Sequence, residues 1–421
     1  MPSKSFREYI YYGLLALPLS LLGLPLYVYL PTFYAQDVGL GIFGVGAVLL
    51  FARLFDMLSD PVVGHLSDHY FSRKTFMLFG LVFLLIGFYF LTHPTQNAGY
   101  IWLFSFSMLV YFGWSLLSIP YYALGADLGE SYKHNTNYAS SREIFNIIGV
   151  VAALLIPYIY GVSESAGESL TLLNSAIFIV LPLAFILFYF KVNAITLQNH
   201  LISLQESFLL FKKELFSSRA LFGAFFLNSF ANAIPATLFL FYVEFVIGAK
   251  ESAGILLLLY FFSGLVALAF WSKLANRISK KRAWSFSIIN AIIFFTFVPF
   301  LGEGDFVPFM LITIFSGMSL GADMALPASM QADVAQNSKD APREMGGTLF
   351  GFFAMLVKLS LAFGVGVSFA ILGLFDFDAT APNENSLTAL IFLYGALPVA
   401  LKIAALFVLS RYEEKSESFA S

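Results

Sequence analysis

The chain has 421 residues, of which 59% are hydrophobic and 12% are charged, and its formal net charge is −3. Soluble globular proteins carry about 45–50% apolar and about 25% charged residues, so this composition excludes an ordinary soluble domain. Cysteine is absent, which excludes disulfides and thiolate metal sites. We predict an integral membrane protein that lies in a lipid bilayer and has no nucleic-acid partner.

Apolar runs long enough to cross a bilayer recur twelve times. They cover residues 10–34, 42–66, 75–91, 100–126, 140–161 and 170–191, and then residues 220–247, 253–274, 283–301, 307–334, 345–372 and 388–409. Runs of this length are helical, because barrel strands alternate in polarity at every second residue. We predict an all-α fold of twelve transmembrane helices. The first run is too long for a signal peptide and lacks a cleavage pattern, so we expect it to be retained as a span.

The basic residues predict the orientation, since Lys and Arg accumulate in cytoplasmic loops. Alternate loops and the two termini hold Lys4, Arg7, Arg73, Lys74, Lys133, Lys191, Lys212, Lys213, Lys273, Arg277, Lys280, Lys281, Arg282, Lys339, Arg343, Arg411 and Lys415. The opposite loops contribute only Lys250. We expect both termini in the cytoplasm and a multi-pass protein of the bacterial inner membrane.

Two weak internal sequence similarities indicate a duplication. At an offset of 207 residues, "GHLSDHYFSRK" aligns with "WSKLANRISKK", and Pro120 aligns with Pro327. Both similarities lie at the inner ends of corresponding spans, which predicts two six-helix halves of equal topology, residues 1–192 and 220–421. The polar linker, residues 193–219, has the periodicity of a short amphipathic helix on the inner membrane face. Two such halves predict a cleft at mid-membrane and rocking of one half on the other, as in secondary transporters.

The second span carries Arg53, Asp56 and Asp60 at spacing i, i+3, i+7, so these charges line one helix face. Each costs roughly 2.5 to 3.5 kcal/mol at the bilayer centre, so the face must turn into the protein or a wet cavity. The fold itself does not require them, because the duplication places uncharged residues at the same positions: Tyr260, Ser263 and Ala267.

Two carboxylates one turn apart favour a cation site, either for Na⁺ through hard oxygen ligands or for a proton. Ser115 and Ser118 on the fourth span lie at a similar depth, and a hydroxyl there could complete the site. The alternatives are an Arg53–Asp56 ion pair that locks helix packing, with Asp60 as a cap, and serine hydroxyls that bond to their own helix.

Other polar side chains also fall within spans. Lys358 lies near the middle of the eleventh span, which predicts either a contact with the solute or a static ion pair with Asp56 or Asp60. Asp323 on the tenth span and Arg142 on the fifth are candidate substrate-binding residues, with packing as the alternative. We expect Lys402 to reach the inner interface. In the loops, Asp68, Arg73 and Lys74 predict a cytoplasmic charge latch that acts in gating.

Several of these segments together resemble one family. "RLFDMLSDPVVGHLSDHYFSRKTF" resembles the second helix and following loop of the glycoside, pentoside and hexuronide cation symporters, the melibiose permease family of the major facilitator superfamily. "SIPYYALGADL", "YASSREIFNIIG" and "MLVKLSLAFGVGVSFAILGLFDF" resemble its fourth, fifth and eleventh helices, in that order.

The resemblance implies that Asp56 and Asp60 bind the coupling cation, with Ser115 where the permease has a threonine. It also implies that Lys358 lies near the cation site and Arg142 close to bound sugar. The sugar-binding aspartates of the permease are replaced by Ser20 and Ser118, and its stacking tryptophan by Tyr122. A buried hydroxylated ligand needs its hydroxyls satisfied, so this pattern argues against galactoside specificity.

We expect a cation-coupled symporter, driven by Na⁺ or H⁺ and without another cofactor, for a small organic solute that is sugar-like by resemblance. The alternative solute is a lysophospholipid or another amphiphile. An enzyme is not expected, because the five histidines fall in or beside loops and HExxH is missing. The absence of GxxxxGK[ST] argues against an ATP-driven pump. A receptor or scaffold would have no reason to keep charges at depth. We expect a monomer in which cation binding raises solute affinity.

Overall fold

The computed structural model describes residues 6–70, 72–129, 131–162, 165–193, 204–336, 346–377 and 382–414, and this part of the chain contains only helices and their connections. The chain divides into two compact units. Unit 1 comprises Met1–Phe211 and Gln331–Met355, and unit 2 comprises Lys212–Met330 and Leu356–Ser421. The segment Gln331–Met355 therefore belongs to the first unit although it lies late in the sequence. Residues 194–203 of the predicted linker and Lys4, Lys339, Arg343 and Lys415 lie outside the described residues.

The helices before the linker are α1 (Phe6–Gly13), α2 (Ala16–Leu24), α3 (Leu30–Thr32), α4 (Ile42–His69), α5 (Arg73–Thr92), α6 (Tyr100–Gly129), α7 (Tyr132–Ile159) and α8 (Ala166–Lys191). The π-helical turns η1 (Pro25–Tyr29) and η2 (Phe33–Asp37) interrupt the first of the predicted spans. Proline removes a backbone donor from such a helix, and η1 begins at Pro25.

The later helices are α9 (Leu204–Ser217), α10 (Arg219–Phe245), α11 (Ala253–Ile278), α12 (Lys280–Phe295), α13 (Phe306–Gln336), α14 (Gly346–Leu374), α15 (Glu384–Ile391) and α16 (Leu397–Ser410). Short turns η3 (Lys250–Ser252), η4 (Val298–Phe300) and η5 (Phe392–Ala396) accompany them. The helix predicted in the linker corresponds to α9.

Ten of the predicted spans coincide with helices that are long and apolar enough to cross a membrane, counted over the described residues. The other two correspond to the interrupted segment α1 to η2 and to α4, whose 28 residues extend about 42 Å at ~1.5 Å per residue. The chain is therefore an all-helical, multi-pass membrane protein. A total of twelve spans stays a prediction.

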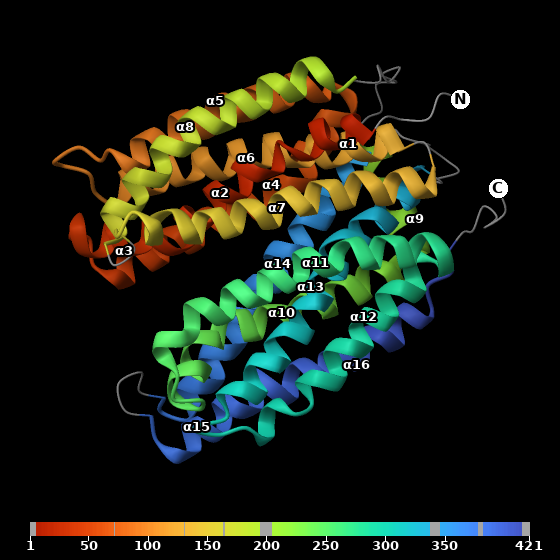
Figure 1. Ribbon diagram of the computed structural model, residues 1–421. Coiled ribbons are helices and arrows are strands. Elements are labelled where there is room, and N and C mark those ends of the chain that lie inside the picture. The colour runs from red at the N-terminus through yellow and green to blue at the C-terminus, as the bar shows by residue number, and fades with distance from the viewer. Residues whose placement is uncertain are drawn as a thin grey trace. The chain divides into compact units, whose positions relative to one another are not determined.

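Glycines allow the helices of unit 1 to pack closely. A Cβ on Gly80 of α5 would lie 2.6 Å from the Leu117 nitrogen of α6, and one on Gly113 of α6 would lie 2.6 Å from the Leu84 nitrogen. Small residues that let backbones approach are the usual means of packing membrane helices. In the same unit α5 also packs against α8, α4 against α6, and α2 against α7 (Figure 1).

Glycines also allow close helix packing in unit 2. A Cβ on Gly317 of α13 would lie 2.4 Å from the Tyr260 oxygen of α11, and one on Gly321 would lie 2.5 Å from the Gly264 oxygen. The helices α10, α12 and α16 pack together (Figure 1). Tyr242 of α10 stacks on Tyr394 of η5 with ring centroids 4.1 Å apart.

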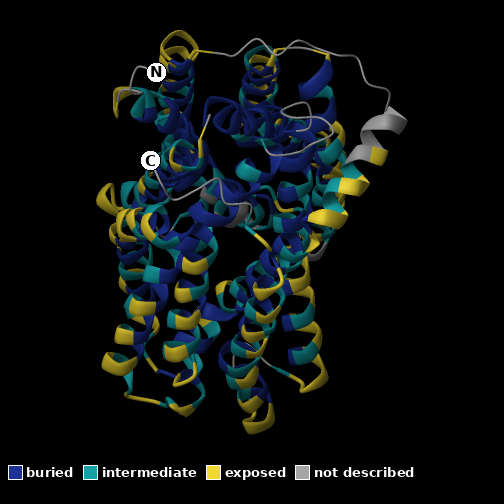
Figure 2. Ribbon diagram, turned by 90° about the vertical axis from the view of Figure 1, so that its right-hand side faces the viewer, coloured by how far each residue is buried: buried dark blue, intermediate teal, exposed yellow. Residues whose placement is uncertain are grey.

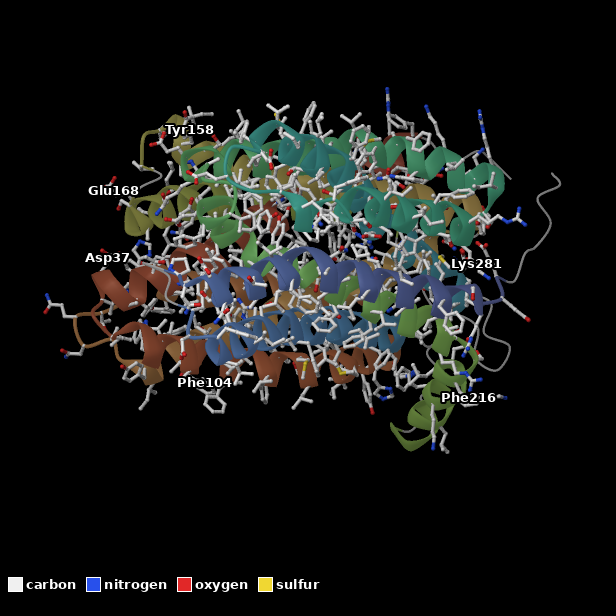
Figure 3. The ribbon with its side chains drawn as sticks, turned by 90° about the horizontal axis from the view of Figure 1, so that it is seen from below. Asp37, Phe104, Tyr158, Glu168, Phe216 and Lys281 are labelled. Carbon is white, nitrogen blue, oxygen red and sulfur yellow. The ribbon has the colours of Figure 1, made fainter. Side chains whose placement is uncertain are left out.

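Exposure follows the pattern expected for helices that face lipid. Many helices carry exposed residues along one side and buried residues along the other (Figure 2). The exposed side is apolar, with residues such as Phe51, Leu58, Phe190 and Phe407. Within unit 1, Asp37, Tyr158 and Glu168 lie at one end, and within unit 2, Phe216 and Lys281 lie toward one end (Figure 3). In each unit these residues lie near helix ends that the predicted topology assigns to a single side of the membrane.

Candidate functional site

The clearest polar site of unit 1 joins α4 and α6. Asp56 and Asp60 are 6% and 0% exposed, one turn apart on α4, and Ser115 of α6 lies between their carboxylates. The Ser115 Oγ is 2.8 Å from the Asp56 Oδ1 and 2.6 Å from the Asp60 Oδ1. The structure thus brings together the three residues predicted as the cation site.

This geometry has a consequence for charge. A serine hydroxyl has one hydrogen to donate, so it can satisfy one of the two carboxylates and not both. A proton on a carboxyl group, or a cation among the oxygens, would make the second close oxygen–oxygen contact favourable as well. Carboxylate and hydroxyl oxygens are also the hard ligands that alkali and alkaline-earth cations prefer. The donor set therefore fits a proton or Na⁺.

The local sequence explains how α4 presents these oxygens. Pro61 follows Asp60 inside the helix and has no N–H, so the Met57 carbonyl loses its usual helical donor. A Cβ on Gly351 of α14 would lie 2.4 Å from the backbone oxygen of Asp60. The first part of α14, which belongs to unit 1, thus packs directly on the helix turn that carries the acid.

The loop charges form a second cluster at one end of α4. Asp68 accepts hydrogen bonds from the backbone nitrogens of Gly347 (2.7 Å) and Thr348 (2.8 Å) and from the Thr348 hydroxyl (3.0 Å). The carboxylate thereby caps the start of α14, where orphan N–H groups and the helix dipole favour negative charge. Arg73 bonds to Asp68 at 3.0 Å and also bonds to Asp127 of α6.

The backbones of α4 and α14 approach closely at this cap, because a Cβ on Gly64 would lie 2.2 Å from the Gly347 oxygen.

Lys74 has a different environment from Asp68 and Arg73, its predicted partners in the latch. Its Nζ donates to the backbone oxygens of Tyr189 (2.6 Å) and Val192 (2.5 Å) at the end of α8, where a cation complements the helix dipole. Lys74 therefore joins α5 to α8.

Among the predicted solute residues of unit 1, Arg142 of α7 contacts Tyr122 of α6. Its guanidinium lies over the Tyr122 ring at 4.0 Å from the centroid, and it bonds to Glu143. Ser118 is buried on α6. Ser20 of α2 donates to the backbone oxygens of Ala16 (2.9 Å) and Leu17 (3.0 Å), so its hydroxyl is used within its own helix.

Unit 2 holds a buried charge pair of its own. Asp323 of α13 accepts from the Trp284 ring nitrogen and from the Asn232 side chain, both at 2.8 Å. The Lys402 Nζ is 3.6 Å from Asp323 and donates to the Asn228 Oδ1 at 2.8 Å. The expectation that Lys402 reaches the inner interface is wrong, since the residue is 4% exposed and its ammonium faces these groups.

Two further predicted residues, Lys358 and Arg53, lie on α14 and α4. Lys358 is half-buried on the part of α14 that belongs to unit 2. Arg53 lies with its guanidinium 5.9 Å from the Tyr111 ring centroid. Within the described residues, no group of three or more His, Cys, Asp or Glu side chains could hold a metal ion, so a cation at Asp56 and Asp60 would also need hydroxyl or backbone oxygens.

Sequence reasoning missed Glu143 and the role of Lys402. Glu143 follows Arg142 directly in "SREIFN" and is 4% exposed, so a second charge beside the first was available as a signal. Asn228 accepts from Lys402, and Asn232 donates to Asp323. Neither asparagine could be recognised as a partner from the sequence, because a single Asn in a membrane helix is compatible with many surroundings.

Taken together, the apolar helices and their buried charges define an integral membrane protein that handles polar species inside the bilayer. The chain belongs to the family described as MFS/sugar transport protein, whose family model matches residues 11–414. It is a secondary transporter of the major facilitator superfamily.

Curated relatives agree with this assignment. The chain is 23% identical over 403 residues to "Uncharacterized symporter YnaJ" of Bacillus subtilis, covering 91% of this chain and 86% of the relative. It is 24% identical over 383 residues to "Glucuronide carrier protein homolog" of Escherichia coli, covering 84% and 80%. It is also 26% identical over 202 residues to "Sodium-dependent lysophosphatidylcholine symporter 1-A" of Danio rerio, covering 46% and 38%.

Solved structures confirm the fold. The outward conformation of FucP, a major facilitator superfamily transporter, has a TM-score of 0.70 at 16% identity and covers 97% of this chain and 98% of its own. A bacterial homologue of the iron transporter ferroportin, in the outward-facing state, has a TM-score of 0.70 at 12% identity and covers 97% and 99%. At these identities the likeness extends to the fold alone.

Proposed function

We propose that the protein is a cation-coupled symporter that moves a small, sugar-like organic solute by alternating access. The observation that carries the proposal is the Ser115 hydroxyl shared between the buried carboxylates of Asp56 and Asp60. Two buried carboxylates that meet at one hydroxyl offer hard oxygen ligands and proton acceptors, so the site is suited to one exchangeable positive charge, Na⁺ or H⁺.

The charge of the bound cation couples cation binding to solute binding in this proposal. Binding of the cation neutralises part of the acidic face of α4 and raises the affinity for the solute, and linkage requires the solute to raise the cation affinity equally. Arg142, Tyr122 and Ser118 contribute the solute site of unit 1, and Lys358 is the corresponding candidate within unit 2. Asp323, the other candidate of unit 2, also holds Lys402 there.

The cluster of Asp68, Arg73 and Asp127 acts as the cytoplasmic gate in this proposal. Asp68 has four hydrogen-bonded groups around it, three of them at the start of α14, so movement of α14 away from α4 must break several charge-assisted bonds at once. The full topology proposed is twelve spans in a monomer, with both termini in the cytoplasm of a bacterial cell.

Similarity to the sodium-dependent lysophosphatidylcholine symporter of Danio rerio supports one alternative solute, a lysophospholipid or another amphiphile. That similarity covers less than half of either chain, whereas the bacterial relatives are matched over most of their length. The sugar-like solute therefore remains the leading proposal.

The test is uptake into proteoliposomes with Na⁺ replaced by choline at fixed pH, and separately with a pH gradient. The probes are 4-nitrophenyl glucoside, galactoside and glucuronide, and lysophosphatidylcholine. Asp56→Asn and Asp60→Asn should each abolish cation-stimulated uptake, while Asp37→Asn, the same change at an exposed position, should not. Unchanged cation dependence in both site variants would falsify the proposal.

A further inference from the structure

The Arg142 guanidinium is held by the residue that follows it. The Arg142 Nε donates to the Glu143 Oε1 at 2.8 Å, and the Nη2 lies 2.7 Å from the same oxygen. The second oxygen of Glu143 accepts from the Asn146 side chain at 2.9 Å. Arg142 and Glu143 are each 4% exposed, so their charges compensate each other in a dry environment.

The ion pair itself joins no two helices. Arg142, Glu143 and Asn146 all lie on α7, so the hydrogen bonds among these three residues stay within one helix. Outside α7, Arg142 hydrogen-bonds the neutral Tyr12 of α1 and lies over the Tyr122 ring of α6. A static ion pair that stabilises helix packing would be expected to bridge two helices, as Asp323 and Lys402 do in unit 2.

Two side chains of intermediate exposure flank the pair. Tyr122 and Asn146, which flank it, are both only half-buried, whereas Arg142 and Glu143 are buried. A solute that reaches the Tyr122 ring would meet the donors of Arg142 and the acceptors of Glu143 at the same place. A carboxylate offers about four lone-pair positions, so Glu143 can accept further hydrogen bonds while it keeps Arg142 and Asn146.

The charge balance then determines the class of solute. An unpaired buried arginine would attract a carboxylate or phosphate, but an anion placed here would meet the negative charge of Glu143 within a few ångströms, where repulsion is strong at low dielectric. An uncharged solute with several hydroxyl groups meets a matched set of donors and acceptors. Glu143 also supplies the acceptor carboxylate that Ser20 and Ser118 cannot provide.

We propose that Glu143 is a specificity-determining residue: by neutralising Arg142 it makes the solute site of unit 1 selective for an uncharged polyhydroxylated molecule over its carboxylate- or phosphate-bearing analogue. This proposal rests on the proposed symport function, since it assigns the solute class at the same site.

The test uses matched probes that differ only in charge. Binding to the purified full-length protein in saturating Na⁺ is measured for 4-nitrophenyl β-D-glucoside and its glucuronide, and for the galactoside and its galacturonide. In each bound pair the native protein should bind the neutral member at least about 10-fold more tightly. Glu143→Gln should reduce this ratio by about 10-fold or invert it, because Arg142 then faces the solute as an uncompensated cation.

Glu168→Gln is the control, since it removes the same charge from an exposed position on α8. Should Glu143→Gln fail to fold, Asn146→Leu provides a second variant. It keeps both charges but releases one oxygen of Glu143, so neutral binding should weaken while the preference for the neutral member persists.

Three results would overturn the proposal: equal binding of neutral and acidic members by the native protein, an unchanged ratio in Glu143→Gln, or no binding of any neutral probe. Failure of the symport proposal is distinguishable, because it would show as cation dependence that survives Asp56→Asn and Asp60→Asn whatever the preference among probes.

Discussion

The buried acids of the two units differ in how their charge is balanced. In unit 1, Asp56 and Asp60 share the single hydroxyl of Ser115. In unit 2, Asp323 has two neutral donors at 2.8 Å and the ammonium of Lys402 at 3.6 Å. In unit 2 a side-chain ammonium thus lies beside the acid, whereas in unit 1 two acids meet at one hydroxyl, an oxygen set that we propose admits a proton or Na⁺. The difference indicates where an exchangeable cation can act.

The largest loss of stability should follow from removing one member of the Asp323–Lys402 ion pair in unit 2. Asp323→Asn or Lys402→Met leaves a buried charge without its partner, which costs about 3–5 kcal/mol. Each single variant should lose stability in a thermal unfolding assay of the purified protein, and the double variant should recover most of it. Stable single variants, or a double variant as unstable as its parents, would contradict a self-contained pair.

Asp68 offers a comparison inside unit 1, because it is a buried acid whose partners are fully provided. Asp68→Asn replaces an acceptor of two backbone N–H groups, and loss of charged hydrogen bonds costs about 1.5–3 kcal/mol. The chain has no cysteine, so Val63→Cys, buried beside this cluster, gives a single reporter.

Maleimide labelling at that cysteine should accelerate when Asp68→Asn is added, and Glu168→Gln should leave the rate unchanged. Equal rates in all three backgrounds would remove Asp68 from the gate. Cation affinity should be retained in this variant, in contrast to changes at Asp56 or Asp60.

Variants of Ser115 test whether the shared hydroxyl contributes to cation affinity at Asp56 and Asp60. Ser115→Ala removes the shared hydroxyl but leaves both acids, so the cation affinity should fall by about 10-fold, the equivalent of one hydrogen bond. Ser115→Thr keeps a hydroxyl and should behave as the native protein. A titration of cation-dependent thermal stabilisation measures both, and equal affinities in Ala and Thr would exclude a role for the hydroxyl.

Ser20 should show the smallest effect. Its hydroxyl donates to backbone oxygens one turn back on α2, as serines in membrane helices commonly do. Ser20→Ala should therefore change solute uptake by less than about twofold. A loss as large as that of Ser115→Ala would show that the Ser20 hydroxyl turns to meet the solute.

The apolar helices and the meeting of Asp56, Asp60 and Ser115 could be predicted because they depend on local signals. Apolar length gives a span directly, and charges at i, i+3 and i+7 define a face of the helix that lipid does not tolerate. The shared Ser115 contact needed only the additional estimate of depth on the neighbouring helix.

Other features could not be predicted, because they depend on which face of a helix meets which neighbour. Lys402 has a side chain long enough for either the interface or the interior, and Asn228 on α10 decides the outcome. The pairing of Glu143 with Arg142 depends on how the two neighbouring side chains are oriented on α7, which the sequence does not specify. The grouping of Gln331–Met355 with unit 1 depends on Gly64 and Gly347, whose close contact is not visible in a hydropathy pattern.

The most direct measurement is the number of exchangeable cations bound per chain, taken by equilibrium dialysis with radioactive Na⁺ and by potentiometric titration for H⁺. We expect one cation per native chain, none in the Asp56→Asn, Asp60→Asn double variant, and one in Asp323→Asn. An unchanged count in the double variant, or a count that disappears with Asp323, would contradict the account.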